Sequence, residues 1–594
     1  IHSNLAVYSL RACAGEYRDA VELAEYTINN QKDYILEELY KRKPDVLCFS
    51  CYIWNIDYVT DIAREYKKLC PSVPIWVGGP EVSYEVEAFL RENPYIDGVM
   101  IGEGEDTFRE LCGYYAHKRK LSDIAGIAFR KNSTGNSTSV NNIGGNKAGE
   151  IVFTSPRPIK NMSEIPFCYD TLDDFSNRII YYESSRGCPF SCSYCLSSVD
   201  KTLRFRDTEI VKRELKFFID QKVPQIKFVD RTFNCNHAHA MELWRFIKAN
   251  DNGVTNFHFE ISADLLNQEE LELIFDMRPG LIQLEIGVQS TNEATIKEIH
   301  RTMKLERLKE VVRLIQSGNN IHEHLDLIAG LPYEDYDSFG RSFDEIYELK
   351  PNQLQLGFLK VLKGSYMFEH AAEYGIVYHD KPPYEVMSTK WLSFDDVIKI
   401  KRVEDMLEVY YNSGQFEITM KLMECIFDSA FEFFQELGDF YEANGYFGMS
   451  HSRIRRCEIL LEFLALYLHG CDSDAMTSVV LSENAGDRDN TDFDENAQIY
   501  KMIQESLIFD LYYRENCKSR PVWATDIGSF KHMTHAYCKN GKLSHVEPFH
   551  YIFPDKHTRK LDELPKYHKE PVWALFHYDM RDPLDHQALV EYIE

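Results

Sequence analysis

The stretch Arg186-Gly-Cys188-Pro-Phe-Ser-Cys192-Ser-Tyr-Cys195 decides how the rest of the chain is interpreted. It places three cysteines on one short loop with the spacing CxxxCxxC, directly after a segment (178–185) that has the pattern of a strand. Three soft thiolates on one loop can hold three irons of a four-iron cubane and leave the fourth iron open. The spacing therefore predicts a 4Fe–4S cluster held by Cys188, Cys192 and Cys195.

A zinc knuckle is the alternative interpretation of the same cysteines. Zinc sites normally combine one closely spaced pair with a second pair, or with histidines farther along the chain. No second cysteine pair lies nearby, although His237 and His239 follow downstream. The pattern favours the iron–sulfur cluster over zinc.

Apolar and amphipathic segments alternate on the carboxyl side of this loop, which indicates an α/β fold. Helical patterns at 210–221 and 307–318 separate the strand candidates. Six β/α units predict a partial (β/α)6 barrel over residues 178–375. Its strand candidates are 178–185, 225–230, 257–262, 281–288, 322–330 and 352–361.

The regions on either side of the barrel have different patterns. Residues 1–125 carry apolar runs at 44–54, 73–79 and 96–105 between amphipathic stretches, which predicts a doubly wound, Rossmann-like sheet. Residues 126–177 read as a linker whose hairpin strands flank a polar tip at 133–148. Residues 376–594 contain long amphipathic patterns such as 427–445 and 455–470, so we expect a mostly α-helical domain that carries substrate identity.

The CxxxCxxC loop resembles the signature of the radical S-adenosylmethionine (SAM) superfamily, which has an aromatic residue before the last cysteine, here Tyr194. The resemblance extends across about 178–365. It implies that the open iron chelates the amino and carboxylate groups of SAM. Reduction then cleaves SAM to a 5′-deoxyadenosyl radical that abstracts a hydrogen atom from the substrate.

Further segments resemble the strands that contact SAM in that superfamily. KFVDRTF (227–233) implies that Asp230 meets the SAM amino group, although many relatives carry a second acidic residue where this chain has Arg231. FEIS (259–262) implies a role for Glu260 near the ribose or carboxylate of SAM. The segments IGVQS and IAGLP imply contacts from Gln289 and Ser290, and from the backbone at Ala329 and Leu331 beside adenine.

Period-two spacing on the strands indicates a polar cavity inside the barrel. His258 and Glu260 share one strand face, as do Gln283, Glu285 and Gln289, and as do His322, His324 and Asp326. These faces could instead be solvated on the outside of the barrel. For the strand that begins near 321, the opposite face is apolar (Ile321, Leu325, Leu327), as a helix-covered face should be. We predict that the polar faces line the lumen, with Glu285, His322 and His324 as catalytic candidates.

The N-terminal segments SNLAVYSL (3–10), FSCYIWN (49–55), GGPEVS (78–83) and GEGE (102–105) resemble the cobalamin-binding domain found in one group of radical SAM enzymes. Glycines at strand ends let a large planar ligand approach the backbone, although a generic nucleotide-binding sheet remains the alternative. An Asp-x-His-x-x-Gly motif is absent, which implies cobalt without a histidine ligand. The implied contacts are Ser50, Cys51, Gly78, Gly79, Pro80, Glu81, Gly102, Glu103 and Gly104, and Tyr52 and Trp54 are either neighbours of cobalt or core aromatics.

Composition indicates where the protein acts and what it binds. The chain has 594 residues, a net charge of −28 and 15 cysteines, of which we expect twelve to be reduced thiols. We expect a cytoplasmic protein without a membrane span; the first residue is Ile1, so a short N-terminal strand is expected to precede it. Within 514–569, eleven lysines and arginines face six acidic residues, with aromatics between them. This basic segment is either a docking surface for tRNA or a solvated face.

Two cofactors side by side narrow the chemistry without fixing the reaction. The basic segment favours a tRNA nucleoside as substrate, specifically the removal of the epoxide oxygen from epoxyqueuosine in queuosine maturation. The alternative is methylation of an unactivated carbon in a small molecule or peptide, and ring formation is a third possibility. A corrinoid-binding sensor with a structural cluster is the non-enzymatic hypothesis. An enzyme of this kind also needs an electron donor such as flavodoxin or ferredoxin.

Overall fold

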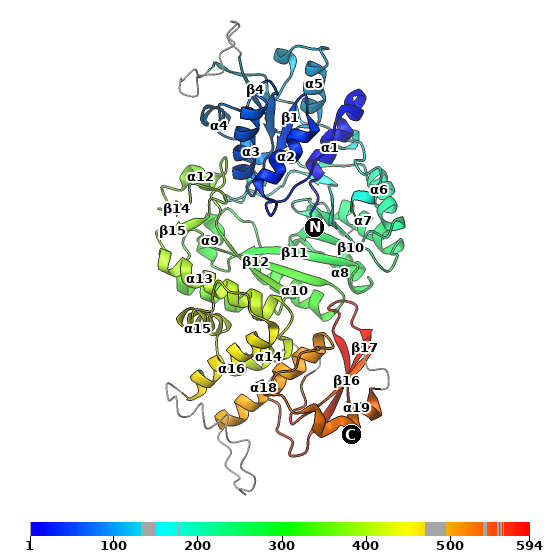
Figure 1. Ribbon diagram of the computed structural model, residues 1–594, viewed down its shortest axis with the longest axis vertical. Coiled ribbons are helices and arrows are strands. Elements are labelled where there is room, and N and C mark those ends of the chain that lie inside the picture. The colour runs from blue at the N-terminus through cyan, green and yellow to red at the C-terminus, as the bar shows by residue number, and fades with distance from the viewer. Residues whose placement is uncertain are drawn as a thin grey trace.

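The computed structural model describes residues 2–131, 149–175, 178–469, 495–538, 543–554, 558, 561 and 563–593. Figure 1 shows three regions in succession along the long axis of the molecule, with the N-terminal region at the top and the last strands at the bottom. The polar tip predicted at 133–148 lies outside the described residues, as do several charged positions of the basic segment 514–569.

The N-terminal region is built on a five-stranded mixed sheet in the order β1-β2-β3-β4-β5. Strands β1 (Leu47–Ser50), β2 (Ile75–Gly78) and β3 (Gly98–Met100) are parallel and coincide with the predicted apolar runs. The hairpin β4 (Ile127–Arg130) and β5 (Ile151–Phe153) pairs antiparallel with β3, so it extends this sheet instead of forming a separate linker. The helices are α1 (Leu5–Cys13), α2 (Lys32–Arg42), α3 (Ile56–Leu69), α4 (Val86–Glu92) and α5 (Glu105–Tyr115).

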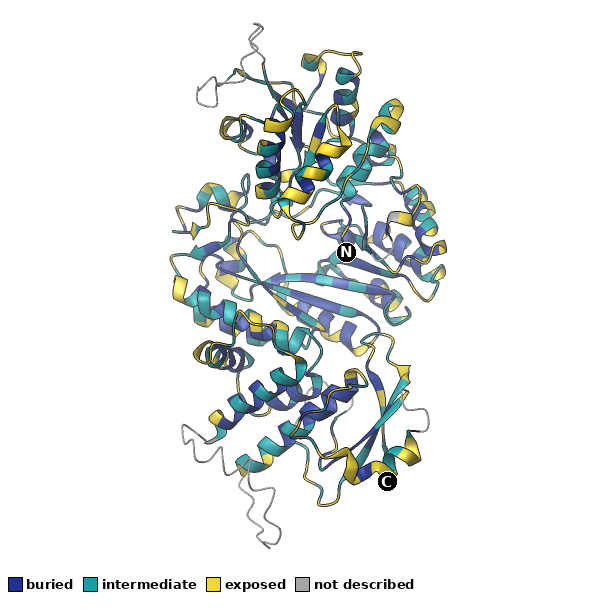
Figure 2. Cartoon of the chain, viewed as in Figure 1, coloured by how far each residue is buried: buried dark blue, intermediate teal, exposed yellow. Residues whose placement is uncertain are grey.

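The central region contains a parallel sheet of six strands in the order β13-β12-β11-β10-β9-β6, as the partial (β/α)6 barrel predicts. Leu325 and Leu327 are fully buried on the outer face of β12, and in Figure 2 β11 and β12 are dark blue along much of their length. The strands are β6 (Ile180–Tyr182), β9 (Gln225–Phe228), β10 (Asn256–Ile261), β11 (Ile282–Gln289), β12 (His322–Ala329) and β13 (Gln353–Phe358).

Helices cover the outer face of this sheet because their apolar stripes face it. In α10, for example, Val311, Val312 and Ile315 are fully buried while Arg313 on the opposite side is exposed. The helices of this region are α6 (Thr208–Asp220), α7 (His237–Ala249), α8 (Gln268–Phe275), α9 (Glu293–Glu298), α10 (Leu305–Ser317), α11 (Tyr336–Tyr347) and α12 (Tyr366–His370). A two-stranded unit, β7 (Ser185–Arg186) with β8 (Arg204–Phe205), carries the cysteine loop between its strands.

The C-terminal region is mostly helical, as expected, but it ends in a three-stranded antiparallel sheet that the sequence pattern did not predict. This sheet consists of β16 (Ser544–Phe549), β17 (Val572–Arg581) and β18 (Ala588–Ile593), and the hairpin β14 (Val377–Tyr378) and β15 (Val386–Ser388) opens the region. Of the helices in the described ranges, none is both long and apolar enough to cross a membrane. The helices are α13 (Phe394–Leu407), α14 (Glu417–Met423), α15 (Ala430–Ala443), α16 (Arg453–His469), α18 (Glu495–Arg514) and α19 (Lys531–Tyr537).

Candidate active site

A cavity of about 2270 Å³ lies between the N-terminal sheet and the inner face of the central sheet. Pockets for single small molecules are typically about 300–1,000 Å³, so this cavity has room for more than one ligand. Predicted residues from both regions line it, namely Ser50, Gly78, Gly79, Pro80, Glu81, Gly102 and Gly104 on one side and Tyr194, Cys195, Glu260, Glu285 and Gln289 on the other. The positions implied by the resemblance to the cobalamin-binding domain and those implied by the resemblance to the radical SAM superfamily therefore line one cavity.

Other predicted residues lie behind this lining. Glu103 and Asp230 form ion pairs or hydrogen bonds that are described below, and the Ser290 hydroxyl donates to Glu334 Oε1 at 2.6 Å. His322 and His324 follow on β12 but are not among the residues that line the cavity. The residues outside the lining are Cys51, Glu103, Cys188, Cys192, Asp230, Ser290, His322, His324, Ala329 and Leu331. The predicted catalytic role of the two histidines and the predicted cofactor contacts of the other residues stay predictions.

No described residue after Leu362 lines the cavity. The residues that line the cavity therefore give no support to the expectation that the C-terminal region determines the substrate. That region reaches the site indirectly, because Tyr384 donates a hydrogen bond to Glu81 on the N-terminal side of the cavity.

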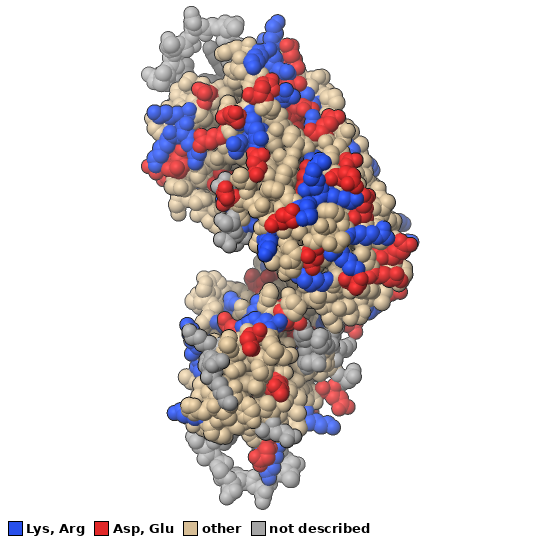
Figure 3. Space-filling view, turned by 90° about the vertical axis from the view of Figure 1, so that its right-hand side faces the viewer, with Lys and Arg blue, Asp and Glu red and all other residues tan. Residues whose placement is uncertain are grey.

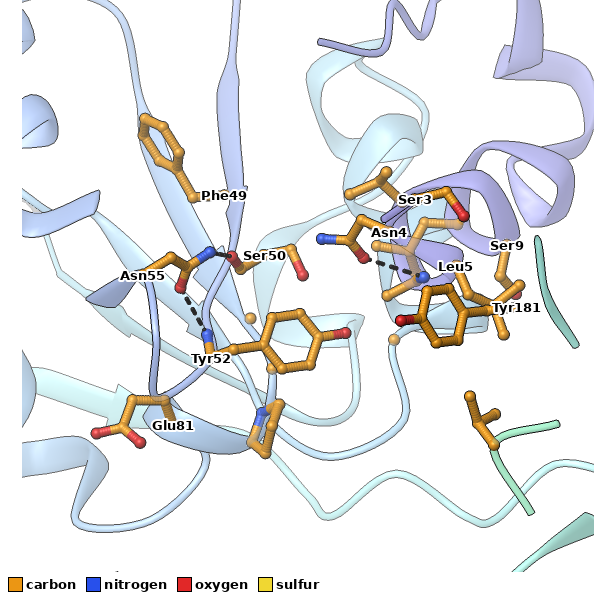
Figure 4. Close-up of a pocket in the computed structure, with 18 of the residues that line it drawn as sticks. Ser3, Asn4, Leu5, Ser9, Phe49, Ser50, Tyr52, Asn55, Glu81 and Tyr181 are labelled. Carbon is orange, nitrogen blue, oxygen red and sulfur yellow. Dashed lines mark hydrogen bonds between the residues drawn. The ribbon is translucent and has the colours of Figure 1, made fainter. Parts of the chain in front are cut away.

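The loop after β1 forms the N-terminal wall of the cavity (Figure 4). The Asn55 side chain fixes its shape, accepting from the Tyr52 amide at 2.8 Å and donating to the Ser50 carbonyl at 2.9 Å. Tyr52 extends into the pocket, and its ring stacks on Trp54 with centroids 4.5 Å apart. Tyr52 and Trp54 were expected to be either neighbours of cobalt or core aromatics. Trp54 is 63% exposed, so it is not a core aromatic.

Two glycines shape the same wall. Gly79 has φ +118°, and a Cβ there would lie 2.4 Å from the Cys51 carbonyl oxygen, so β1 and β2 approach too closely for a side chain. Gly102 has φ +75°, and a Cβ there would meet nothing within 4 Å, which leaves this part of the wall open to a ligand.

The cysteine loop is tied to the barrel by main-chain hydrogen bonds and by a buried arginine. The Ser193 amide donates to the Ile299 carbonyl at 2.9 Å. Arg301 Nη1 lies 3.7 Å from Cys192 Sγ and 3.2 Å from the Tyr194 hydroxyl, and its Nη2 donates to the Gly287 carbonyl. Burial raises the pKa of the Cys192 thiol, and the Arg301 guanidinium opposes this effect and so favours the thiolate form that an iron requires. Arg301 carried no sequence signal, because its contacts come from residues far away in the chain.

Asp230 anchors the start of the loop. Its carboxylate accepts from the Ser184 amide at 2.9 Å and from the Ser184 and Ser185 hydroxyls at 2.6 Å each. Burial raises the pKa of Asp230 to about 6, against the effect of these hydrogen bonds. In the structure Asp230 therefore positions the strand that leads into the cysteines, which is a role that the resemblance did not imply.

Polar side chains cross the floor of the cavity in rows, because the strands pair in register. One row is Lys227, His258, Gln283 and His322, and the next is Glu260, Glu285 and His324. Lys227, Glu260, Glu285 and Asp326 line the cavity, as predicted for a polar lumen.

Ion pairs organise this floor. Glu285 Oε2 lies 2.8 Å from Lys227 Nζ and 2.9 Å from His258 Nε2, although the histidine is not aligned as a hydrogen-bond donor. Burial alone would raise the pKa of Glu285, but these two neighbours outweigh it and lower the pKa to about 2. Burial raises the pKa of Glu260 to about 7, and it lowers that of His322 to about 4 with a contribution from His324. At neutral pH Glu285 is therefore ionised and His322 is neutral.

Gln289 ends β11 in a strained conformation. Its φ is +76°, and the pairing of β11 with β12 shifts register between Gly287 and Gln289. The buried Oε1 of Gln289 has no hydrogen-bond partner within the described residues, and the side chain lines the cavity. Strain of this kind at a cavity wall is typical of a binding position.

Ion pairs across the two regions fasten the cysteine loop to the N-terminal region. Arg186, the residue two positions before Cys188, lies 2.5 Å from Glu105 and 3.3 Å from Glu103, and it also pairs with Glu183 at 2.9 Å. Glu103 also pairs with Arg204 at 2.6 Å. Glu103 and Glu105 are widely separated from their arginine partners in the sequence, so no local pattern indicated these pairs.

The geometry does not support the zinc alternative. Among the described residues, no group of three or more histidine, cysteine or acidic side chains is placed to hold a metal ion. His237 pairs with Glu270 at 3.0 Å, and His239 lies 3.0 Å from the Ser184 hydroxyl. In a cubane, by contrast, each thiolate binds its own iron, so the ligands do not converge on one point.

Family comparisons agree with this division of the molecule. Residues 1–112 match the B12 binding domain, residues 182–346 match the radical SAM superfamily, and residues 372–587 match a family described as a protein of unknown function (DUF4080). The chain therefore combines a B12-binding domain with a radical SAM domain, and the relatives that it matches include cobalamin-dependent radical SAM enzymes.

The individual relatives that the chain matches are named for different reactions. It is 26% identical over 365 residues to the cobalamin-dependent radical SAM methyltransferase TokK of Streptomyces tokunonensis, covering 57% of this chain and 49% of that protein. It is 22% identical over 355 residues to the anaerobic magnesium-protoporphyrin IX monomethyl ester cyclase of Rubrivivax gelatinosus, covering 57% of this chain and 60% of that one. The chain thus spans about half the length of the first curated relatives that it matches.

A solved structure supports the fold. The cobalamin-dependent SAM radical enzyme OxsB aligns with a TM-score of 0.53 at 15% identity, covering 86% of this chain and 78% of that one. The B12-binding and radical SAM matches end at residue 346, whereas the alignment covers 86% of the chain. It therefore also includes much of the region after the barrel.

The residues present fit a 4Fe–4S cluster, SAM and cobalamin. Cys188, Cys192 and Cys195 are free thiols on one anchored loop. Gln289 presents an unpartnered buried oxygen on the barrel side, and Gly102 leaves the opposite wall open. The cavity that joins these positions exceeds the size of an ordinary single-ligand pocket.

Proposed function

We propose that this enzyme transfers a methyl group to an unactivated carbon of a small molecule. The observation that carries the proposal is the single cavity of about 2270 Å³, which is lined both by the cobalamin-side glycines and by the SAM-side residues of the barrel. When bound, SAM at the cluster supplies hydrogen abstraction, and methylcobalamin supplies a methyl group. A shared cavity allows both to reach one substrate carbon without release of the substrate.

The chain's own residues have three tasks in this proposal. Arg301 and Asp230 hold the cysteine loop in place. Glu285, fixed by Lys227 and His258, forms a polar floor that orients the substrate. The paired aromatic rings of Tyr52 and Trp54 cover the cobalamin side and help to exclude water.

The tRNA hypothesis has less support. The described part of the segment 514–569 includes α19 and β16, at the end of the molecule farthest from the N-terminal region (Figure 1). Arg520 there is paired with the buried Glu547 instead of facing an external phosphate. Figure 3 turns this side to the viewer, and the lysines and arginines visible on the lower third are scattered rather than gathered. Methylation of a small molecule is therefore preferred over reduction of epoxyqueuosine.

An external reductant is part of the proposal. Methyl transfer consumes two SAM molecules and two electrons for each substrate C–H bond. It yields the methylated product, methionine, 5′-deoxyadenosine and S-adenosylhomocysteine. We propose a small one-electron carrier, such as flavodoxin or ferredoxin, as the partner that supplies these electrons.

Product analysis tests the proposal. Anaerobically reconstituted enzyme receives SAM with a deuterated methyl group, cobalamin, a reductant and a metabolite extract, and mass spectrometry follows the products. A new species carrying the labelled methyl group, with equal amounts of 5′-deoxyadenosine and S-adenosylhomocysteine, supports methyl transfer. Formation of 5′-deoxyadenosine without S-adenosylhomocysteine would contradict it and favour ring formation, and loss of oxygen from tRNA nucleosides would restore the reductase hypothesis.

A further inference from the structure

The ionised side chains on the barrel part of the cavity wall fall into two groups. The first group is paired: Lys227 is bound to Glu285, and Asp326 lies 3.1 Å from His324, which is itself outside the lining. The second group comprises Arg231, Glu260 and Lys360, for which the described part of the chain provides no hydrogen bond from the side chain and no ion pair. Arg231 and Lys360 are exposed side chains that line the cavity.

The unpaired charge on this wall is therefore mainly positive. Glu260 counts for less than a full negative charge, because burial raises its pKa to about 7. The chain as a whole has a net charge of −28, so two unpaired cations here do not reflect a surplus of basic residues. Unpaired cations on a cavity wall indicate a ligand of opposite charge.

Arg231 stands where the two halves of the cavity meet. It directly follows Asp230 after β9, and its charge acts on Glu260 of the barrel and also on Tyr52 of the N-terminal wall. Lys360 directly follows Leu359 beyond β13, an edge strand that three other strands separate from β9. The two cations therefore line one cavity from positions that follow β9 and β13.

We propose that Arg231 and Lys360 bind an anionic group, a carboxylate or a phosphate, of the molecule that this enzyme modifies. The inference deepens the proposed function and rests on it for the identity of the cavity as a substrate site. A guanidinium offers paired donors that match a carboxylate or a phosphate, and an ammonium adds a point charge. Binding of an anion to these side chains leaves the Lys227–Glu285 pair intact, so it costs no existing ion pair.

The same chemistry has two other sources, the carboxylate of SAM and the phosphate of cobalamin. The experiment separates them because each ligand is titrated by itself. Full-length enzyme, reconstituted with its cluster, is titrated with SAM and with hydroxocobalamin, and the loaded enzyme is then titrated calorimetrically with malonate and with inorganic phosphate as probe anions. The variants are Arg231→Gln, Arg231→Lys and Lys360→Gln, and the matched control is Arg313→Gln on the outer side of α10.

We expect wild-type enzyme and Arg313→Gln to bind one of the probe anions with the same affinity. Arg231→Gln and Lys360→Gln should each weaken that affinity at least about tenfold, because each removes one of the two charges. Arg231→Lys should recover part of the loss. Affinities for SAM and hydroxocobalamin should stay unchanged in every variant, which also reports that the variants fold.

Two results would overturn the inference. One is absence of anion binding by wild-type enzyme, or binding that Arg231→Gln and Lys360→Gln leave unchanged. The other is weaker binding of SAM or hydroxocobalamin by Arg231→Gln, which would assign the arginine to a cofactor. Neither titration requires turnover. Anion binding can therefore fail while product analysis still shows methyl transfer, and anion binding can succeed while product analysis shows no methyl transfer.

Discussion

Replacing Glu105 by glutamine should loosen the attachment of the cysteine loop to the N-terminal region. Glu105 Oε1 lies 2.5 Å from Arg186 Nη2, and the exposed fractions of the two side chains are 6% and 18%. Glutamine keeps an oxygen acceptor but removes the charge, and Arg186 retains Glu183 and Glu103. A hydrogen bond to a charged group contributes about 1.5–3 kcal/mol, so we expect a loss of about 2 kcal/mol. At about 1.4 kcal/mol per factor of ten, local opening should become about 30-fold more frequent.

Hydrogen exchange measured by mass spectrometry checks this value on peptides that cover residues 185–195. The Ser193 amide, which donates to the Ile299 carbonyl, should exchange about 30-fold faster in Glu105→Gln, because opening of the loop limits its exchange. Glu16→Gln is the matched control, since Glu16 pairs with Arg109 on the same region but both side chains are half exposed. Unchanged exchange in Glu105→Gln, or an equal rise in Glu16→Gln, would refute the reasoning.

Three further perturbations test other parts of the account. Cys188→Ala should abolish the cluster absorbance and the formation of 5′-deoxyadenosine. The control is Cys235→Ala, which should retain both, because Cys235 is a neighbour of Cys188 outside the loop. A cluster that persists in Cys188→Ala would disprove the ligand assignment. Gly187→Ala should lower the iron content after reconstitution, because a Cβ would lie 2.5 Å from the Thr202 carbonyl oxygen at φ +86° and strain costs about 1–3 kcal/mol; wild-type iron content would contradict this. Burial raises the pKa of Asp510 to about 7, so its favourable contribution to folding is complete below about pH 4 and is lost as the pH rises to about 7. The difference in melting temperature between wild type and Asp510→Asn should therefore fall between pH 5 and pH 8, and a constant or growing difference would show that the carboxyl is ionised throughout.

Local patterns were sufficient to predict the parallel strands and the polar lumen. The period-two alternation around His324 and Asp326 predicted which face of β12 turns inward, because burial on one side of a strand imposes that alternation. The CxxxCxxC spacing predicted the loop that carries Cys195 to the cavity wall. Such features depend on residues that are close together in the sequence.

Features that depend on distant partners could not be predicted in this way. Arg186 and Glu105 are 81 residues apart, and the hairpin β4–β5 reads the same whether or not it joins β3. The same limitation applies to Asp230, whose side chain hydrogen-bonds with Ser184, and to the strands of the C-terminal sheet, which follow long helical patterns. In each case tertiary pairing, not local preference, determines the outcome.

Magnetic coupling between the two cofactors tests most directly the claim that they share one cavity. Electron paramagnetic resonance would compare the relaxation of cob(II)alamin bound to the enzyme with the cluster oxidised and with the cluster reduced. Because a shared cavity brings cobalt near the loop of Cys195, the cobalt signal should relax faster once the cluster becomes paramagnetic, and this effect should disappear in Cys188→Ala. A cobalt signal that does not respond to the state of the cluster would contradict the account.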